Sequence, residues 1–311
     1  MSLSVGIVGL PNAGKSTLFN ALATRRLAET APRPFTTIEP HEAVVAVPDP
    51  DLDKLSLLVK PDTTAPATIT FIDIAGLVKG AHQGEGLGNQ FLGKIREVDA
   101  IAHVARAFSD PYVTHAHPTH EPGTLEQIVE DIEIVNLELE LAGITGKHSI
   151  YVLNFGEGEL KDPKVQDYIT SIENKFGDKA ISVSAKLEEE MTDLSQEERR
   201  ALLKEMGIAE SGLEKLIKTS YKLLDLISFY TIKGGKELHA WSLKNGASAI
   251  EAAEVVHTDF AKGFIKAEVI SVDELFEVGD WNQAKEKGKL RLEGRDYKVL
   301  DKDVIEFKTS S

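Results

Sequence analysis

The chain has 311 residues, of which 42% are hydrophobic, and it contains no cysteine. This length exceeds a usual single core, so two domains are expected. The absence of cysteine excludes a disulfide framework, a disulfide-linked partner and a thiol nucleophile. The formal net charge is −15, so a contact with nucleic acid would need a local basic patch. Without a long apolar run or a leader-like segment, we expect no membrane insertion and a cytoplasmic protein.

Residues 9–17 read Gly-Leu-Pro-Asn-Ala-Gly-Lys-Ser-Thr, which is the G-x-x-x-x-G-K-[ST] pattern of a phosphate-binding loop. The apolar run Ser4–Val8 predicts a buried strand before it, and Lys15–Leu22 predicts a helix after it. In such a loop, backbone N–H groups point at phosphate oxygens, Lys15 reaches the β- and γ-phosphates, and Ser16 binds Mg²⁺. The residues predicted to bind nucleotide here are Asn12, Ala13, Gly14, Lys15, Ser16 and Thr17.

Apolar runs alternate with helical patterns through the first two thirds of the chain, which indicates an α/β fold with a mostly parallel sheet flanked by helices. The predicted strands are Ser4–Val8, Ala43–Val47, Ala67–Ile72, Ala100–Ala105, Ser149–Leu153 and Ala180–Ser184. The predicted helices are Lys15–Leu22, Leu87–Glu97, Leu125–Leu141 and Gly212–Leu226.

After Ile227 the pattern changes to short alternating strands. Turn signals stand at Gly234-Gly235, Asn245-Gly246 and Gly294-Arg295-Asp296. Ser248 can cap a short helix that runs through Val256. A hairpin, a helix and further strands indicate a small ubiquitin-like β-grasp domain. We therefore expect a nucleoside triphosphatase domain over residues 1–226 and a β-grasp domain over residues 227–311.

A D-x-x-G element, Asp73-Ile74-Ala75-Gly76, follows the third predicted strand. Asp73 is placed to hold Mg²⁺ through water, and the N–H of Gly76 is placed to touch the γ-phosphate, so that hydrolysis would release this segment. The glycine-rich residues 80–88 that follow are expected to form a mobile switch. The loop 34–40, Pro-Phe-Thr-Thr-Ile-Glu-Pro, lies where a first switch would sit, and a threonine there, with Thr37 as our candidate, would complete the Mg²⁺ shell.

The residue after Gly76 is Leu77, where small GTPases often carry a glutamine that orients the attacking water. An apolar side chain cannot do this, so another group must orient the water or turnover must be slow. The nearest candidates are His115, His117 and His120 in the loop from Phe108 to Thr124. Three histidines can also form a metal site, but a solvated loop is the commoner arrangement without nearby cysteine.

Together these segments resemble the Obg-like ATPase family of the YchF type, within the translation-factor-related P-loop NTPases. The residues that carry the resemblance are 9–17, 34–40, 73–101, 257–270 and 291–297. The resemblance implies that Leu77 replaces the catalytic glutamine and that a histidine of the mobile loop takes part in hydrolysis. An alignment by eye favours His115. It also implies that the C-terminal β-grasp domain is a TGS domain and that the ribosome is a partner.

Asn154-Phe155-Gly156-Glu157 stands where a GTPase would carry Asn-Lys-x-Asp. Glu157 is one methylene longer than the usual Asp, and Phe155 removes the Lys, so the guanine-reading geometry is altered. In the resembled family an Asn-x-x-Glu element accompanies a preference for ATP, although a carboxylate can still accept hydrogen bonds from guanine. Ser184 and Ala185 are expected to form the last base-binding loop.

Family members insert a long helical arm before the base-specificity strand, but here residues 142–147 lead almost directly into it. The arm is therefore absent or shortened. We expect slow ATP hydrolysis that drives a conformational switch. The alternatives are a GTPase of the Obg class and a binding module that holds nucleotide with negligible turnover. A basic stretch in the β-grasp domain is a candidate contact for RNA or the ribosome, unless these are ordinary solvated side chains. It comprises Lys285, Lys287, Lys289, Arg291, Arg295 and Lys298.

Overall fold

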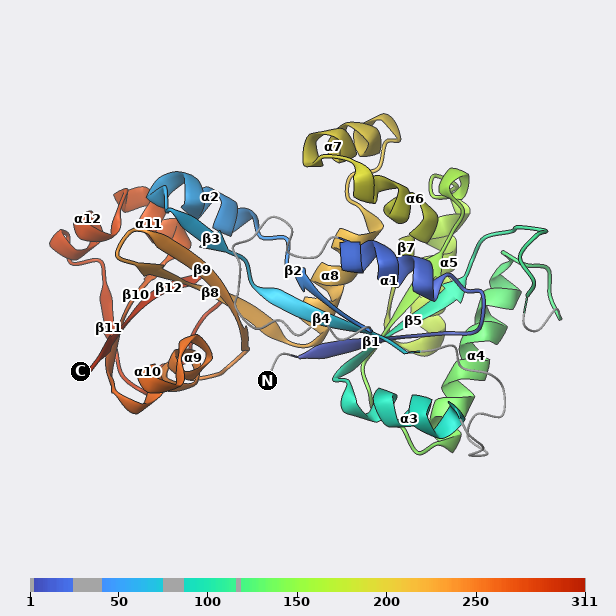
Figure 1. The fold of residues 1–311 in the computed structure, drawn as a ribbon, viewed down its shortest axis with the longest axis horizontal. Helices are drawn as coiled ribbons and strands as arrows, with labels where there is room; N and C mark the ends of the chain where they lie inside the picture. The colour runs from blue at the N-terminus through green and yellow to red at the C-terminus, as the bar shows by residue number, and fades with distance from the viewer. Residues whose placement is uncertain (1–2, 25–40, 75–86, 116–118, 311) are drawn as a thin grey trace. The chain divides into compact units, whose positions relative to one another are not determined.

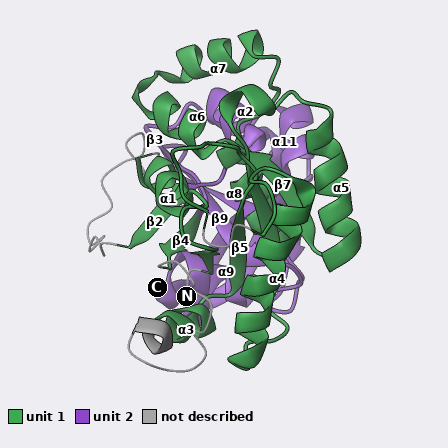
Figure 2. Ribbon diagram, turned by 90° about the vertical axis from the view of Figure 1, so that its right-hand side faces the viewer, with its two compact units in different colours: residues 1–26, 37–45, 69–223 green, residues 27–36, 46–68, 224–311 purple. Residues whose placement is uncertain are grey.

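The computed structural model describes residues 3–24, 41–74, 87–115 and 119–310. These residues form two compact units (Figures 1 and 2). Most of the described chain up to Leu223 belongs to the first unit. The second unit contains residues 46–68 and the chain from Leu224 onward.

The first unit is built on a six-stranded sheet in the order β2-β4-β1-β5-β6-β7. Its strands are β1 (Ser4–Val8), β2 (Glu42–Ala46), β4 (Thr68–Asp73), β5 (Ala100–Arg106), β6 (Ser149–Asn154) and β7 (Lys179–Val183). β1 pairs in parallel with β4 and β5, and β5-β6 and β6-β7 are also parallel. Every residue of β5 is buried, as expected for a strand that is covered on both faces. The structure confirms the predicted α/β fold.

Helices cover this sheet on both sides (Figure 1). They are α1 (Lys15–Thr24), α3 (Leu87–Glu97), α4 (Leu125–Leu141), α5 (Lys164–Phe176), α6 (Ala185–Glu190) and α8 (Gly212–Leu223), while α7 (Gln196–Glu205) packs against α6. The single turns η2 (Glu157–Glu159) and η3 (Met191–Asp193) complete the unit. α3 and α4 share one hydrophobic cluster with β1 and β5, and α4 and α5 share another with β6.

All four predicted helices are present, but α8 ends at Leu223 instead of Leu226. Asp225 has a φ angle of +50°, so the chain reverses there and enters the next strand. The sequence analysis did not predict α5, α6 and α7. The chain between α4 and β6 is a short turn with positive φ angles at Gly143 and Gly146. No helical arm is inserted at that position.

The second unit contains a six-stranded sheet in the order β11-β10-β12-β8-β9-β3. Its strands are β3 (Thr63–Ala65), β8 (Leu226–Lys233), β9 (Glu237–Lys244), β10 (Phe264–Ser271), β11 (Arg291–Glu293) and β12 (Asp303–Thr309). β8 and β9 form an antiparallel hairpin, β12 pairs in parallel with β8, and β10 pairs antiparallel with β12. A hairpin whose first strand is parallel to the last strand is the β-grasp arrangement that the turns predicted.

The helices of this unit are α2 (Pro50–Val59), α9 (Ala249–Val256), α10 (Thr258–Lys262), α11 (Val272–Val278) and α12 (Trp281–Glu286). Ser248 and Glu251 form a capping box at the start of α9, as the sequence predicted for Ser248. Ala249, Ala252 and Ala253 are fully buried in the cluster beneath the sheet. Small side chains therefore let this helix approach the strands closely.

Residues 46–68 belong to the second unit, which differs from the expected division into 1–226 and 227–311. β3 adds to the sheet edge by pairing in parallel with β9. The hydroxyl of Tyr230 donates to both carboxylate oxygens of Asp49, the N-cap of α2, at 2.8 and 3.0 Å. Lys302 lies 2.7 Å from the carboxylate of Asp51. These partners are far apart in the sequence, so no local pattern could assign the segment to this unit.

Candidate nucleotide-binding site

The phosphate loop joins β1 to α1, and the space around two of its glycines excludes any side chain. A Cβ on Gly9 would lie 2.2 Å from the carbonyl oxygen of Val104, and one on Gly14 would lie 2.1 Å from Nδ2 of Asn154. The φ angles of Gly9 and Gly14 are +150° and +95°, which residues other than glycine rarely adopt. Asn12 also has a positive φ angle, +64°. The backbone therefore turns tightly enough for its N–H groups to surround an anion.

Lys15, the first residue of α1, is buried against this loop. Its ammonium donates a hydrogen bond to the carbonyl oxygen of Leu10 at 2.7 Å. Burial lowers the pKa of Lys15 to about 8, and the negative charge of Asp73 opposes this shift. Among the described residues its hydrogen-bond partner is this neutral carbonyl, and a buried cation held in this way is well placed to exchange the carbonyl for phosphate oxygens.

Ser16 and Asp73 are the described members of the predicted Mg²⁺ site. Ser16 is exposed at the start of α1. Asp73 is the last residue of β4 and pairs with Ile7 of β1, the strand that leads into the phosphate loop. A hydroxyl and a carboxylate are oxygen ligands that suit Mg²⁺, whose remaining positions are usually filled by water and substrate phosphates. Thr37, the third predicted ligand, and Gly76, which is predicted to contact the γ-phosphate, lie outside the described residues.

Within the described part of the chain, no group of three or more His, Cys, Asp and Glu side chains could hold a metal ion. A metal at Ser16 and Asp73 would therefore take most of its ligands from phosphate and water. This donor set fits a metal that arrives with a nucleotide.

Asn154 joins the phosphate loop to the loop after β7. Its side chain is buried, its Nδ2 donates to the carbonyl oxygen of Ala13 at 2.9 Å, and its Oδ1 accepts from the N–H of Ala185 at 2.9 Å. The predicted base-reading residue thus uses both ends of its amide inside the protein. The two loops expected to contact phosphate and base are held at a fixed distance as a result.

One arginine side chain holds the loop that follows β5. Arg106 is buried and donates to three carbonyl oxygens: Nε to Phe108 at 3.1 Å, Nη2 to Asp110 at 3.0 Å and Nη1 to Val113 at 2.9 Å. Its guanidinium also lies 4.6 Å from the centre of the Phe108 ring. Burial lowers the pKa of Arg106, while Asp110 and Asp131 oppose the shift.

His115 follows this loop and packs against α4. Its Nε2 lies 3.1 Å from Oδ2 of Asp131, and Nε2 of Gln127 donates to the same oxygen. Burial raises the pKa of Asp131, whereas the hydrogen bonds from His115 and Gln127 act in the opposite direction. The carbonyl oxygen of Thr114 accepts from Nδ2 of Asn12 at 3.0 Å, so the backbone beside His115 is bonded to the phosphate loop.

Comparisons with known proteins agree with this arrangement. Residues 4–154 match a family model described as 50S ribosome-binding GTPase, and residues 226–310 match the model YchF-GTPase_C, described as a protein of unknown function (DUF933). The chain is 42% identical to the Ribosome-binding ATPase YchF of Bacillus subtilis, with 99% of each protein covered. It is 39% identical to the protein of the same name in Haemophilus influenzae, again over 99% of each. The chain belongs to the YchF family.

A solved member of the YchF family, titled the Schizosaccharomyces pombe YchF GTPase, has the same fold. Its TM-score is 0.81 at 31% identity, and the similarity covers 99% of this chain and 98% of that one. A GTP binding protein from Pyrococcus horikoshii shares the fold with a TM-score of 0.63 at 18% identity. The chain is thus a P-loop nucleoside triphosphatase domain with a C-terminal domain.

The alignment with the YchF protein of B. subtilis extends over 371 positions, more than the 311 residues of this chain. The relative therefore has residues that this chain lacks. The short turn between α4 and β6 is the place where the sequence analysis expected such a loss.

The other predicted residues of this YchF-family chain take different positions. Glu157 is exposed at the start of η2. Ser184 is the N-cap residue of α6, and its hydroxyl is buried and lacks a hydrogen-bond partner among the described residues. His120 is partly exposed, 3.8 Å from Glu130 on α4. His117 lies outside the described residues.

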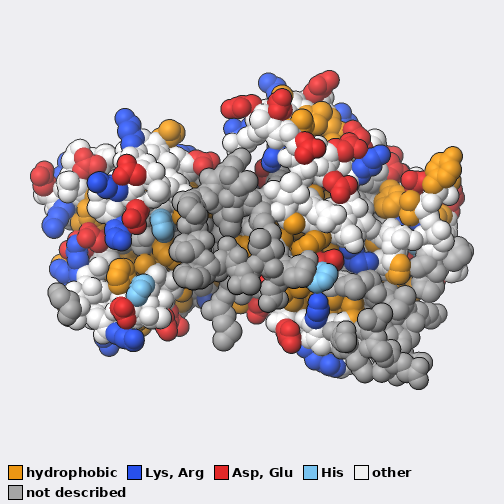
Figure 3. Space-filling model, in the orientation of Figure 1, with side chains coloured by type: hydrophobic (Ala, Val, Ile, Leu, Met, Phe, Trp, Pro, Cys, Tyr) orange, Lys and Arg blue, Asp and Glu red, His pale blue; other side chains and the backbone are white. Residues whose placement is uncertain are grey.

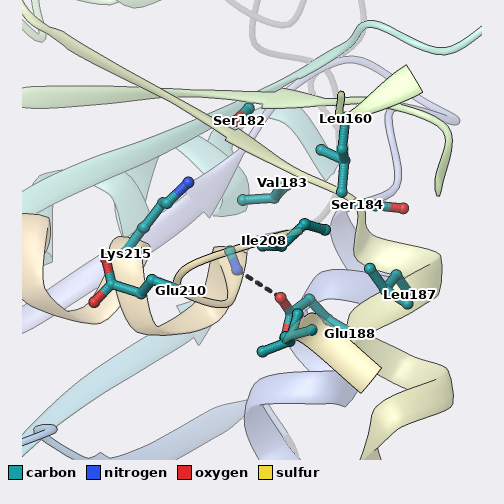
Figure 4. A pocket seen from close by; sticks show the side chains of 11 residues that line it. Leu160, Ser182, Val183, Ser184, Leu187, Glu188, Ile208, Glu210 and Lys215 are labelled. Carbon is teal, nitrogen blue, oxygen red and sulfur yellow. Dashed lines mark hydrogen bonds between the residues drawn. The ribbon is translucent and has the colours of Figure 1, made fainter. Parts of the chain in front are cut away.

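A small cavity lies behind the loop that contains Ser184 (Figure 4). Its volume is about 50 Å³, which is room for water but not for a nucleotide. Leu160, Leu187 and Ile208 contribute apolar walls, and Glu188 accepts a hydrogen bond of 2.6 Å from the N–H of Gly212. No residue of the phosphate loop lines this cavity, so the cavity is not the phosphate-binding site.

Three residues of this site were missed by sequence reasoning: Arg106, Gln127 and Asp131. Arg106 ends a strand whose other residues are apolar except for His103, and a charged residue in a buried strand signals a specific partner. Gln127 and Asp131 lie four residues apart on α4, and they alternate with the buried Ile128 and Ile132. Polar side chains on the apolar face of a helix were the available signal.

Among the described residues, none of the helices combines the length and apolar character needed to cross a bilayer.

Proposed function

We propose that this chain hydrolyses ATP in a Mg²⁺-dependent reaction, prefers ATP to GTP, and associates with the ribosome in the cytoplasm. The observation that carries the proposal is the phosphate loop, with glycines that tolerate no Cβ and a buried lysine that, among the described residues, is bonded only to a carbonyl. The B. subtilis relative is named a ribosome-binding ATPase, which supports the choice of nucleotide and partner.

In this proposal each residue of the site has a defined task. Lys15 exchanges the Leu10 carbonyl for β- and γ-phosphate oxygens, and Gly76 donates its N–H to the γ-phosphate. Ser16, Thr37 and Asp73 would hold Mg²⁺, which neutralises charge that develops on the phosphates.

His115 orients the attacking water, because Leu77 offers no polar group for that task. The water would otherwise lack a hydrogen-bond partner that fixes its direction of attack. This role predicts an effect on turnover and little effect on ATP affinity when His115 is replaced.

The preference for ATP rests on the segment after β6. Phe155 is buried and cannot pack on a base as a lysine stem would. Asn154 is engaged with Ala13 and Ala185, which leaves the exposed Glu157 as the polar side chain of this element that a base can meet. The S. pombe relative is titled a GTPase, so hydrolysis of GTP is the second candidate.

Titration of the full chain with ATP and GTP, with and without Mg²⁺, tests the proposal. We expect ATP to bind at least as tightly as GTP and to be hydrolysed only with Mg²⁺. If GTP bound tenfold more tightly than ATP, a difference of about 1.4 kcal/mol, the chain would be a GTPase instead of an ATPase. Tight binding with no turnover would identify a nucleotide-holding module.

Ribosome association is proposed to use exposed basic residues of the second unit. They are Lys285, Lys287, Lys289, Arg291, Arg295 and Lys298, all exposed. Of the six, Lys285 lies in α12 and only Arg291 lies in β11, so they do not share one face of a strand. Arg291 lies 3.1 Å from Asp303 and is therefore partly neutralised. On the visible face of this unit, basic and acidic side chains are interspersed (Figure 3).

Co-sedimentation with ribosomes at low and moderate salt tests this surface. Replacing Lys287, Lys289 and Arg295 by alanine should reduce pelleting, and salt should reduce it steeply for the wild type. Turnover of ATP should stay unchanged. Equal pelleting of the variant and the wild type would remove the ribosome contact from this surface.

A further inference from the structure

The face of α4 that meets His115 carries a chain of buried polar contacts. The N–H of Gly123 donates to Oε1 of Gln127 at 2.8 Å, and Nε2 of Gln127 donates to Oδ2 of Asp131. The same carboxylate oxygen lies 3.1 Å from Nε2 of His115. Asp131, itself held by Gln127, therefore holds Nε2 of the ring against α4.

In this orientation the His115 side chain is only 6% exposed and that of Asp131 only 3%. A ring that orients an attacking water must present a nitrogen to that water. Here Nε2 is bonded to Asp131 and the ring is packed against α4. Nε2 is therefore unavailable to the water while this bond is made.

The backbone beside the ring is nevertheless close to the phosphate loop. The Thr114 carbonyl accepts from Asn12 of that loop, and Arg106 fixes the preceding carbonyls. Rotation of the ring away from Asp131 is then a smaller change than relocation of the whole loop. The contacts describe a histidine stored beside the site where it would act.

We infer that Asp131, oriented by Gln127, is a positioning residue that stores the His115 ring, and that breaking the His115–Asp131 bond precedes hydrolysis. The inference rests on the proposed role of His115. It predicts slow basal turnover, because only a small population has the released ring and the rate scales with the fraction in the competent state. A partner would accelerate hydrolysis by favouring release.

Steady-state turnover of the full chain with saturating Mg-ATP tests this inference through Asp131→Ala and Asp131→Asn. We expect kcat to rise about tenfold in Asp131→Ala, because a hydrogen bond to a charged group favours the stored ring by at least that factor. Asp131→Asn should show a smaller rise, since its carbonyl can still accept from the ring. KM should stay unchanged in both.

Glu130→Ala is the matched control. It removes a carboxylate at the neighbouring position of α4, and Glu130 faces His120 instead of His115. Its kcat should equal that of the wild type. Thermal melts of each variant identify any that fail to fold, and Gln127→Ala then provides a second route to a loosened Asp131.

The double variant His115→Ala, Asp131→Ala separates this inference from the proposed function. If His115 orients water, His115→Ala alone lowers kcat, and adding Asp131→Ala gives no further change. An unchanged rate in His115→Ala would instead show that the proposed role of His115 is wrong.

Chemical modification of histidines by diethylpyrocarbonate gives a readout that does not depend on turnover. His115 should react slowly in the wild type and faster in Asp131→Ala. The more exposed His120 serves as the internal reference and should not change. A fall in kcat in both Asp131 variants would show that Asp131 supports the active ring instead of storing it. An unchanged kcat with unchanged modification would show that the ring is not stored, so either result overturns the inference.

Discussion

The phosphate loop follows β1 and the loop that leads to His115 follows the neighbouring strand β5, but the two loops are held in different ways. The first is shaped mainly by its backbone, because Gly9 and Gly14 leave no room for a Cβ and have positive φ angles, and the amide of Asn154 ties it to the loop after β7. The second is fixed by the side chain of Arg106, which binds three carbonyl oxygens, and by Asp131 of α4. A loop fixed by its backbone geometry keeps one shape for its ligand. A loop held by side-chain hydrogen bonds can change its position when those bonds are exchanged for others. A rigid phosphate loop therefore lies beside the proposed catalytic histidine, whose side-chain bonds can be exchanged.

The largest expected effect concerns the phosphate loop. Lys15→Ala removes the buried cation and should lower ATP turnover by at least about 100-fold, by analogy with loss of a charge-stabilising group in other active sites. Lys186→Ala is the control, because Lys186 is 78% exposed beside the base loop. It should retain turnover. Steady-state ATP hydrolysis measures both, and equal turnover in Lys15→Ala and wild type would move the site elsewhere.

Gly14→Ala tests whether the loop is fixed by backbone space. The new Cβ would collide with Asn154 and should lower the free energy of unfolding by about 2 to 4 kcal/mol. Gly146→Ala has a similar φ angle of +73° but open space, and should cost only about 1 to 2 kcal/mol. Urea unfolding compares them. Equal losses would show that the φ angle alone matters and that the contact with Asn154 does not.

Arg106→Met tests whether the side chain of Arg106 holds the loop that follows β5. It retains an apolar stem but loses three donors, and should lower the free energy of unfolding by about 2 to 3 kcal/mol. We also expect kcat to fall severalfold, because the backbone that leads to His115 is no longer held by Arg106. ATP affinity should change little.

Arg199→Met is matched to this change, since Arg199 donates to the carbonyl oxygens of Leu194 and Thr192. It should lower stability but leave turnover unchanged. Calorimetry and turnover assays on both variants separate the two effects. A fall in kcat of similar size in Arg199→Met would mean that the loss of stability alone explains the result.

The smallest expected effect is the pH dependence of ATP binding. With a pKa of about 8, Lys15 in the nucleotide-free protein loses its charge as pH rises through 8, so ATP affinity should fall about threefold between pH 7.5 and 8.5. Lys15→Arg, which stays charged, should show no such fall. Isothermal titration at several pH values measures this. A flat profile for the wild type would show that the Lys15 charge does not titrate in this range.

The same shift affects stability. Between pH 8 and 10.5 the unfolded chain keeps the Lys15 proton that the folded chain has lost. Lys15 therefore makes the free energy of unfolding increase as pH rises over that range, so the folded chain becomes more stable. Lys15→Met should lack this contribution in urea unfolding at pH 8 and pH 10.

Patterns along the chain are enough to predict the phosphate loop, the acidic residue at the end of β4, the parallel strands and the β-grasp hairpin. Each of these depends on a local pattern: glycine where the backbone must turn, apolar runs where strands are buried, and Gly234-Gly235 where φ is positive. Local patterns act through neighbouring residues, so they can be read along the chain.

Three features become visible only in the folded chain. Residues 46–68 belong to the second unit, the amide of Asn154 is hydrogen-bonded to Ala13 and Ala185, and His115 is hydrogen-bonded to Asp131. These contacts join residues that are distant in the sequence; Asn154 and Ala13, for example, are 141 positions apart. Whether a polar side chain reads a ligand or holds the protein together depends on which partner packing brings within hydrogen-bond distance. That choice is made by the fold and has no signature in the motif.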